Sequence, residues 1–197
     1  IDRSRGLGDV YKRQSLKKAI RNGVEVNLID LSEDRLADLK SKYGDNKINY
    51  IVSSPDSIAD SIRNSDLILG SVYSLGKNAP KVITDSMLDL VNPGSVMVDI
   101  SIDQGGCFES SKPTTHDDPT FIHKGIVHYC VTNMPGAVPL TASNALNRAT
   151  MSYIHELTNK GIDVALNENK YLRDGLNIYN KDVPNQLVRE ALKSLDN

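Results

Sequence analysis

Two aspartates beside a Gly-Gly pair are the residues of this sequence whose type and spacing best suit acid–base chemistry. Asp99 and Asp103 flank the end of the apolar run "SVMVDI" (95–100), and the tripeptide "QGG" follows directly. A carboxylate just past a strand end can face a substrate, hold a positively charged nitrogen or transfer a proton. Asp99 falls inside the strand pattern, which favours a structural role. Asp103 lies beyond it and is the candidate catalytic residue, with a surface turn residue as the alternative.

A third acid, Asp30, ends an earlier apolar run, "VEVNLID" (24–30). It lies about 20 residues after the place that a glycine turn would occupy, which is the spacing of the acid that binds the adenosine ribose of a dinucleotide. The alternative is an acid that caps the following helix. Arg35 lies one helical turn further along and could cover the adenine ribose, or it could be an ordinary solvated charge.

The stretch "RGLGDVYKRQ" near the N-terminus matches the phosphate-binding pattern G-x-G-x-x-G only in part. Gly6 and Gly8 fit the pattern, but Tyr11 stands in the place of the third glycine. The preceding "IDRSR" is too short and too charged to be a buried parallel strand. A chance pair of glycines is therefore the favoured interpretation, and we assign it no phosphate.

Two further polar segments follow apolar runs. Ser53 ends the run at 48–52, and the glycine-containing segment "GSVYSLGKNAPK" (70–81) could let backbone approach a ligand closely. His116 and the two aspartates after it could suggest a metal site, but no further ligand stands at a suitable spacing. The sequence therefore predicts no metal.

The elements that must position these residues alternate between helix and strand. The spacing of apolar residues, together with N-cap residues such as Ser32 and Thr84, predicts these elements. The expected helices cover 15–22, 33–44, 55–64, 85–91 and 141–160, and the expected strands cover 24–30, 48–52, 66–70, 95–100 and 125–131. Such alternation predicts the α/β class with a doubly wound parallel sheet. Ligands of such sheets bind beyond the carboxyl ends of the strands.

Composition excludes several classes of protein. The net charge is −2 with no basic run, which argues against nucleic acid as a partner. No stretch approaches the ~20 apolar residues that a membrane span needs, and the first residues do not resemble a secretory signal. We therefore expect a cytoplasmic protein in which Cys107 and Cys130 are reduced thiols.

Three long segments resemble alanine dehydrogenases: "VDISIDQGGCFESSKPTTHDDPTF", "HYCVTNMPGAVPLTASNALNRAT" and "GLNIYN". The segment "GSVYSLGKNAPKVIT" adds weaker support. The resemblance runs from about Ser15 to near the C-terminus. A transhydrogenase α-like protein shares the "DQGG" and "NMP" elements and is the alternative within the superfamily. A non-catalytic nucleotide-binding or oligomerisation module is the alternative from another class.

The resemblance implies an NAD-dependent oxidoreductase of alanine catabolism that converts L-alanine to pyruvate and ammonia. It also implies a homo-oligomer, a hexamer when full length. On this comparison residues 15–135 are a truncated Rossmann domain that lacks its first strand and glycine loop, and 136–197 are helices of the catalytic domain. Residues 1–14 do not match and look like foreign sequence. The chain is then expected to be a fragment that is inactive alone.

The family pattern carries over to a set of residues in this chain. Asp103 is the one catalytic position among them. Lys112 stands where an arginine is usual, which keeps the charge but loses a two-pronged hydrogen bond. The expected cofactor-binding residues are Asp30, Arg35, Ser53, Val72, Tyr73, Ile100, Ser101, Ile102, Asp103, Lys112, Val131, Thr132, Asn133 and Met134.

Overall fold

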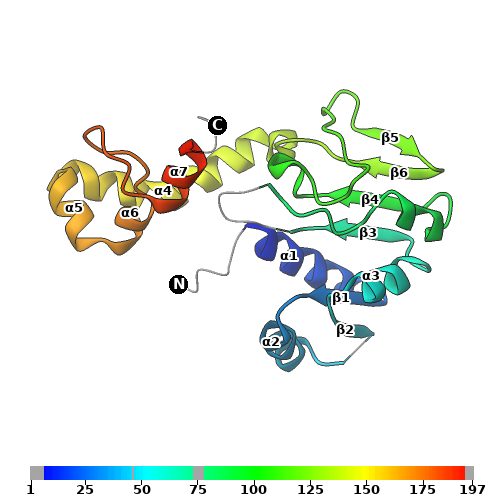
Figure 1. Ribbon diagram of the computed structural model, residues 1–197. Coiled ribbons are helices and arrows are strands. Elements are labelled where there is room, and N and C mark those ends of the chain that lie inside the picture. The colour runs from blue at the N-terminus through cyan, green and yellow to red at the C-terminus, as the bar shows by residue number, and fades with distance from the viewer. Residues whose placement is uncertain (1–6, 46, 73–77, 194–197) are drawn as a thin grey trace. The chain divides into compact units, whose positions relative to one another are not determined.

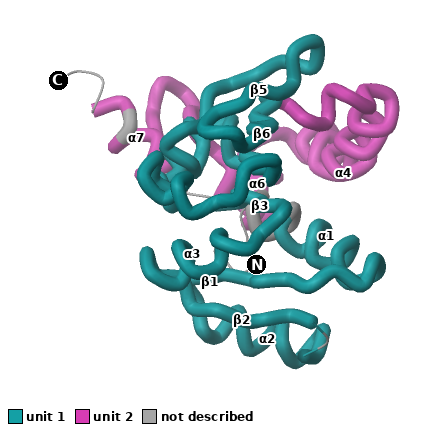
Figure 2. The backbone as a smooth tube through the Cα atoms, turned by 90° about the vertical axis from the view of Figure 1, so that its right-hand side faces the viewer, with its two compact units in different colours: residues 1–132 teal, residues 133–197 magenta. Residues whose placement is uncertain are grey.

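Residues 7–45, 47–72 and 78–193 are described by the structure, which is a computed structural model. The chain divides into two compact units, Ile1–Thr132 and Asn133–Asn197, shown in different colours in Figure 2. The first unit is built from strands and helices, and the second from helices (Figure 1).

The first unit begins with a two-stranded parallel sheet (Figure 1). Helix α1 (Leu7–Arg21) precedes β1 (Val26–Asp30), and α2 (Glu33–Tyr43) connects β1 to β2 (Ile48–Val52). The backbone N–H of Arg35 donates to the Ser32 hydroxyl at 3.3 Å, so Ser32 caps α2 as predicted. Leucines from both helices bury the sheet, because they recur at helical spacing. This core comprises Leu16, Leu28, Leu36, Leu39 and Ile48.

A four-stranded sheet follows, in the order β3-β4-β6-β5. Strands β3, β4 and β6 are parallel, whereas β5 pairs antiparallel with β6. Its core is aliphatic apart from Phe108 and Cys107. The elements of this half are α3 (Pro55–Ile62), β3 (Leu67–Gly70), η1 (Ser86–Leu90), β4 (Val96–Asp99), η2 (Ile102–Gln104), β5 (Thr120–His123) and β6 (Ile126–Tyr129).

The predicted α/β class is confirmed, with parallel sheets and connecting helices. Two local predictions were wrong. The segment after Thr84 is the short 3₁₀ helix η1, and no side chain caps it. Strand β5 was not anticipated; it forms a hairpin with β6 because Lys124 and Gly125 both adopt positive φ, 50° and 76°. Two consecutive residues of positive φ give the tight turn whose twist suits an antiparallel pair.

Among the described residues, no strand lies between β1 of the first sheet and β3 of the second. Strand β1 pairs with β2 alone and β3 pairs with β4 alone. A pocket of about 630 Å³ lies between β1 and β3, and helix α1 also lines it. Ile100, just past the end of β4, lines the same pocket. Each sheet therefore has one open parallel edge toward this pocket.

The second unit is helical. It contains η3 (Met134–Ala137), α4 (Pro139–Lys160), α5 (Ile162–Glu168), α6 (Lys170–Asp174) and α7 (Gln186–Lys193). No side chain of α4 is buried, although the helix carries large apolar residues such as Leu140 and Leu146. No helix among the described residues is long and apolar enough to cross a membrane.

Candidate functional site

Asp30 lies at the carboxyl end of β1, where its side chain contacts three other residues. Its side chain is only 6% exposed. One carboxylate oxygen accepts from the backbone N–H of Ser32 at 3.0 Å. The other lies 3.0 Å from Lys12 Nζ and 3.4 Å from an Arg35 guanidinium nitrogen. The structure therefore brings together Asp30 and Arg35, two of the expected cofactor-binding residues, and adds Lys12, which the sequence analysis did not select.

These contacts determine the charge of the Asp30 carboxyl. Burial by itself raises its pKa. The hydrogen bond from Ser32 and the positive charges of Lys12 and Arg35 outweigh burial, so the pKa lies below its ordinary value. Asp30 is consequently an ionised acceptor at neutral pH. Because a carboxylate accepts but does not donate, it suits hydroxyl groups and repels phosphates.

Ser53 lies beside Asp30 at the end of the neighbouring strand. Its backbone N–H donates to the carbonyl oxygen of Asp30 at 2.9 Å, which extends the parallel pairing of β1 and β2 by one residue. Asp30, Arg35 and Ser53 thus form one group at the carboxyl end of the two-stranded sheet. Gly6 lies outside the described residues, and Gly8 lies within the first turn of α1.

A second group of predicted residues gathers where β3 and β4 end, which we call the carboxyl edge. The N–H of Ile100 donates to the carbonyl of Gly70 at 2.8 Å. The Ser101 hydroxyl donates to the Val72 carbonyl at 2.7 Å and accepts from the Val72 N–H at 2.8 Å. The Ser101 side chain therefore joins the segment after β3 to the segment after β4. Tyr73 lies outside the described residues.

Asp103 lies at the carboxyl edge on η2, directly after the buried Ile102. Asp103 is exposed, whereas Ser101 and Ile102 before it and residues 106–108 after it are buried. The helix ends at Gly105, whose N–H donates to the Ile102 carbonyl at 3.0 Å. Asp103 therefore lies, exposed, on a short turn that follows the end of β4.

Asp99 differs from Asp103 in being fully buried. Its carboxylate accepts from the N–H groups of Ser101 at 2.9 Å and Cys107 at 2.8 Å. Phe108 N–H, the Cys107 thiol and the Ser111 hydroxyl donate to it as well. The side chain thus binds backbone on both sides of the turn that carries Asp103. This is a structural role, because every one of these partners belongs to the protein itself.

The two cysteines are unpaired and buried, so they form no disulfide. Burial, reinforced by the charge of Asp99, raises the pKa of the Cys107 thiol far above its ordinary value. Burial also raises the pKa of Cys130. Since the thiolate is the reactive form of cysteine, both side chains are inert packing residues. They are reduced thiols, as predicted.

The remaining predicted residues do not all join the carboxyl edge. Lys112 Nζ lies 4.4 Å from the centre of the Phe121 ring, an arrangement typical of a cation–π contact. Val131 is fully buried and forms a bridge with Thr114, and the Thr132 N–H donates to the Thr114 carbonyl at 3.3 Å. Asn133 and Met134 belong to the second unit, where Asn133 adopts the left-handed conformation with φ 50°.

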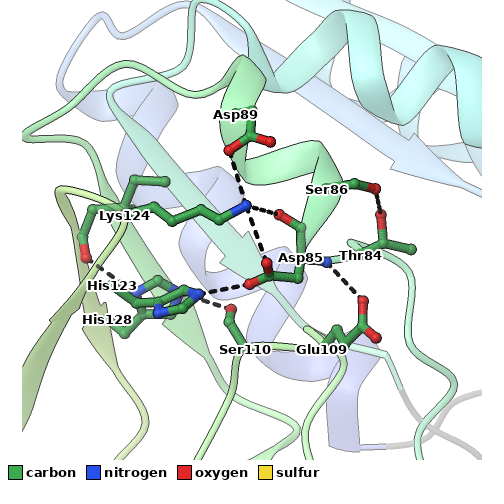
Figure 3. Close-up of polar contacts among 10 residues, drawn as sticks. Thr84, Asp85, Ser86, Asp89, Glu109, Ser110, His123, Lys124 and His128 are labelled. Carbon is green, nitrogen blue, oxygen red and sulfur yellow. Dashed lines mark hydrogen bonds and ion pairs between the residues drawn. The ribbon is translucent and has the colours of Figure 1, made fainter.

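A polar cluster that the sequence analysis missed ties the β5–β6 hairpin to η1 (Figure 3). His123 Nε2 lies 2.6 Å from an Asp85 carboxylate oxygen. Lys124 Nζ contacts both Asp85, at 3.0 Å, and Asp89, at 2.8 Å. The hairpin turn directly precedes β6, which runs parallel to β4. The cluster therefore lies at the amino ends of these strands, away from Asp103.

A buried histidine lies near this cluster. His128 is fully buried, with Nε2 2.9 Å from the Ser110 hydroxyl and Nδ1 3.1 Å from the Ile126 carbonyl. Burial lowers its pKa, so the ring is neutral at physiological pH. Its ring also stacks on Phe121, with centroids 4.8 Å apart. No group of three or more potential metal ligands occurs in the part of the chain that the structure describes.

The sequence of this chain is similar to those of known alanine dehydrogenases. The sequence model of the family "Alanine dehydrogenase/PNT, C-terminal domain" matches residues 8–186. An alanine dehydrogenase from Halomonas elongata is 43% identical over 184 residues, which are 93% of this chain and 49% of the relative. The chain spans about half the length of the curated relatives it matches.

Solved structures agree with the sequence relatives. An L-alanine dehydrogenase superposes with a TM-score of 0.84 at 36% identity, covering 95% of this chain and 52% of that one. A transhydrogenase from Sinorhizobium meliloti reaches a TM-score of 0.67 at 20% identity, covering 88% of this chain and 46% of that one, and shows the fold alone. The chain belongs to the alanine dehydrogenase/PNT family, whose C-terminal domain it matches.

Proposed function

We propose that this chain is the cofactor-binding part of an NAD-dependent L-alanine dehydrogenase. In that reaction L-alanine, NAD⁺ and water give pyruvate, ammonium, NADH and a proton. The observation that carries the proposal is 43% identity, across 93% of this chain, to a relative named alanine dehydrogenase. The more distant transhydrogenase supports only a shared fold. The whole activity is proposed for a longer protein, because the chain covers about half of such relatives.

The position and charge of Asp30 at the end of β1 support the proposal of a nicotinamide cofactor. Its ionised carboxylate ends a parallel strand and is fixed by Ser32 and Arg35. That position and chemistry fit the two hydroxyls of an adenosine ribose. Arg35 and Ser53 would flank the same group. We assign no residue to the phosphates, because the described residues include no glycine turn beside Asp30.

The carboxylate of Asp103 suits the proton transfers that accompany the proposed oxidation of alanine. When bound, NAD supplies the acceptor for the hydride that leaves the α-carbon of alanine. Oxidation of the amine gives an imine, and water must add to the imine carbon before ammonia leaves. Each of these steps moves a proton, and an exposed carboxylate at the carboxyl edge can take or return one. We therefore propose Asp103 as the acid–base group that orients the amine or the water.

The other cofactor contacts are proposed on the family pattern. Backbone at the carboxyl edge would lie against the nicotinamide, because Ser101 holds the two strand ends together there. We also propose a cytoplasmic homo-oligomer, a hexamer when full length, with no metal. The remaining proposed contacts are Val72, Tyr73, Ile100, Ile102, Lys112, Val131, Thr132, Asn133 and Met134.

A rebuilt enzyme tests the proposal. Residues 15–197 would be joined to the N-terminal half of the Halomonas elongata relative, and alanine-dependent formation of NADH would be followed by absorbance. We expect turnover from this rebuilt enzyme and none from the 197-residue chain alone, since hydride transfer needs substrate held in a reactive geometry. A folded rebuilt protein without turnover contradicts the proposed function. Turnover by the isolated chain contradicts the expectation that it is an inactive fragment.

A further inference from the structure

A lysine that the sequence analysis did not select binds the turn beside Asp103. The ammonium of Lys81 donates to three backbone carbonyls: Gly105 at 2.6 Å, Gly106 at 2.9 Å and Phe108 at 3.1 Å. An ammonium group has three N–H donors and no acceptor, so these contacts use its full hydrogen-bonding capacity. Hydrogen bonds from a charged donor are shorter and stronger than neutral ones.

Backbone contacts align the Lys81 segment with the same turn. The N–H of Ala79 donates to the Gln104 carbonyl at 2.8 Å, and the N–H of Val82 donates to the Cys107 carbonyl at 2.8 Å. The segment therefore runs beside residues 104–107 over its described length. Lys81 stands between these two backbone contacts, and its side chain reaches carbonyls that they leave free.

The turn is held by opposite charges. Asp99 accepts N–H groups from Ser101, Cys107 and Phe108, while Lys81 donates to carbonyls of the same stretch. Gly106 shows how close this packing is: a Cβ at that residue would lie 2.7 Å from an Asp99 oxygen. Buried or partly buried backbone groups need such partners, and here an anion and a cation supply them.

We propose that Lys81 is a positioning residue: its ammonium, together with the Asp99 carboxylate, fixes residues 101–108 and so holds Asp103 in place. Lys81 itself contacts backbone and does not touch the reacting atoms. The catalytic consequence rests on the proposed function, whereas the effect on the turn does not. The two can therefore be tested separately.

The effect on the turn is measured by hydrogen exchange of the 197-residue chain at low micromolar concentration. Lys81→Met keeps the length of the side chain but removes its charge and donors. We expect exchange of amides 105–108 to rise about tenfold or more, because charge-assisted hydrogen bonds that restrain local opening are lost. Lys17→Met, at an exposed lysine of α1, is the matched control and should leave these amides unchanged. Lys81→Arg keeps charge and donors and should recover at least part of the protection.

Four results would overturn the inference. The first is that exchange of amides 105–108 is unchanged in Lys81→Met, and the second is that exchange of the β6 amides rises equally. The third is that amides 105–108 exchange as fast in Lys81→Arg as in Lys81→Met. The fourth is that the wild-type chain shows no protection of these amides. An equal rise in β6 would mean that Lys81 stabilises the whole unit without a specific effect on the turn.

Kinetics of the rebuilt enzyme give the second readout. There Lys81→Met should lower kcat by about 10- to 100-fold and change the KM for NAD much less, as expected when a reacting group is misplaced. A change confined to KM would contradict the positioning role. If the unsubstituted rebuilt enzyme is inactive, the proposed function fails, while the exchange experiment still decides whether Lys81 holds the turn.

Discussion

Asp103 and Asp99 lie four positions apart but have opposite surroundings. Asp103 is exposed on η2, and Asp99 is fully buried among five donors. In the rebuilt enzyme, Asp103→Asn keeps the size of the side chain and removes its charge and basicity. We expect kcat to fall about 10²-fold or more, within the usual range for a positioned acid–base group. Stopped-flow measurement of NADH binding should show little change.

Asp99→Asn is the matched control for that substitution. An amide cannot accept from all the donors that surround this carboxylate, so at least one buried N–H or hydroxyl loses its partner. The variant should therefore lower thermal stability of the chain, which Asp103→Asn should leave nearly unchanged. A folded Asp103→Asn enzyme with near-normal kcat would leave Asp103 as a turn residue.

The charge of Asp30 leads to a prediction about the preference for NAD over NADP. Its pKa is lowered, so the carboxylate is charged at neutral pH and, at the proposed ribose site, would repel the 2′-phosphate of NADP. In the rebuilt enzyme, Asp30→Ser should reduce the preference for NAD, measured as the ratio of kcat/KM for NAD to that for NADP. Asp34→Ser, at an exposed acid in the first turn of α2, is the control. An equal ratio in wild type and Asp30→Ser would reduce Asp30 to a strand-end acid that binds Ser32.

Sequence patterns at the residue scale identify strand-end acids better than they identify the residues that support them. Asp30 and Asp103 follow apolar runs, and that pattern is local. Lys81 and Ser111 act on backbone or carboxylate groups far along the chain. Their partners are defined only once β3 and β4 pair, so spacing alone carried no signal for them. Lys12 was missed because its contact with Asp30 forms only when α1 packs against β1.

Elements with strong local signals were predicted well, and those that depend on pairing were not. Strand β2 and helix α3, with Pro55 in its first turn, lie where the apolar pattern and capping residues indicate. Strand β5 is short and half exposed, and it exists because the Lys124–Gly125 turn folds it onto β6. Helix α1 runs through residue 15 without a break. The match of the family model begins at residue 8, within the segment 1–14 that was expected not to match. The separate origin of residues 1–14 stays a prediction.

The turn after β4 yields a prediction about stability. Gly106 has φ 75°, and an added Cβ would meet Asp99 Oδ2 at 2.7 Å and Ser111 Cβ at 2.9 Å. Gly94 also has positive φ, 90°, but a Cβ there would meet nothing within 4 Å. Gly94→Ala should therefore cost about 1 kcal/mol of unfolding free energy from backbone strain alone. Gly106→Ala should cost about 2–4 kcal/mol, because steric overlap adds to the strain.

Urea unfolding of both alanine variants measures this difference. Both substitutions add one methyl group at a residue of positive φ, so the comparison isolates the steric contacts with Asp99 and Ser111. Equal losses of stability in the two variants would mean that the turn shifts freely to accommodate the methyl group. The Asp99 contacts would then be loose, which would also weaken the case for a fixed Asp103.

The whole first unit contains two sheets where one continuous sheet was expected from the alternation of helices and strands. Strands β1 and β3 both present an open parallel edge to the pocket of about 630 Å³. Apolar side chains are exposed there, including Leu67 and Leu69, which are 56% and 42% exposed. The sequence resemblance implied that a first strand is missing, but only the pairing pattern identifies which edges lack a partner.

Open edges of this kind predict how the 197-residue chain behaves in solution. Unpaired strand edges and exposed apolar side chains promote association between copies. We expect association that increases with concentration, measured by sedimentation velocity. Leu69→Lys places a charge on the β3 edge and should reduce association, because like charges on an edge oppose pairing. Leu31→Lys, at an 81% exposed leucine outside the strands, makes the same exchange and should reduce it much less. A monodisperse monomer with a sharp, reversible melt would show that these edges are closed in solution.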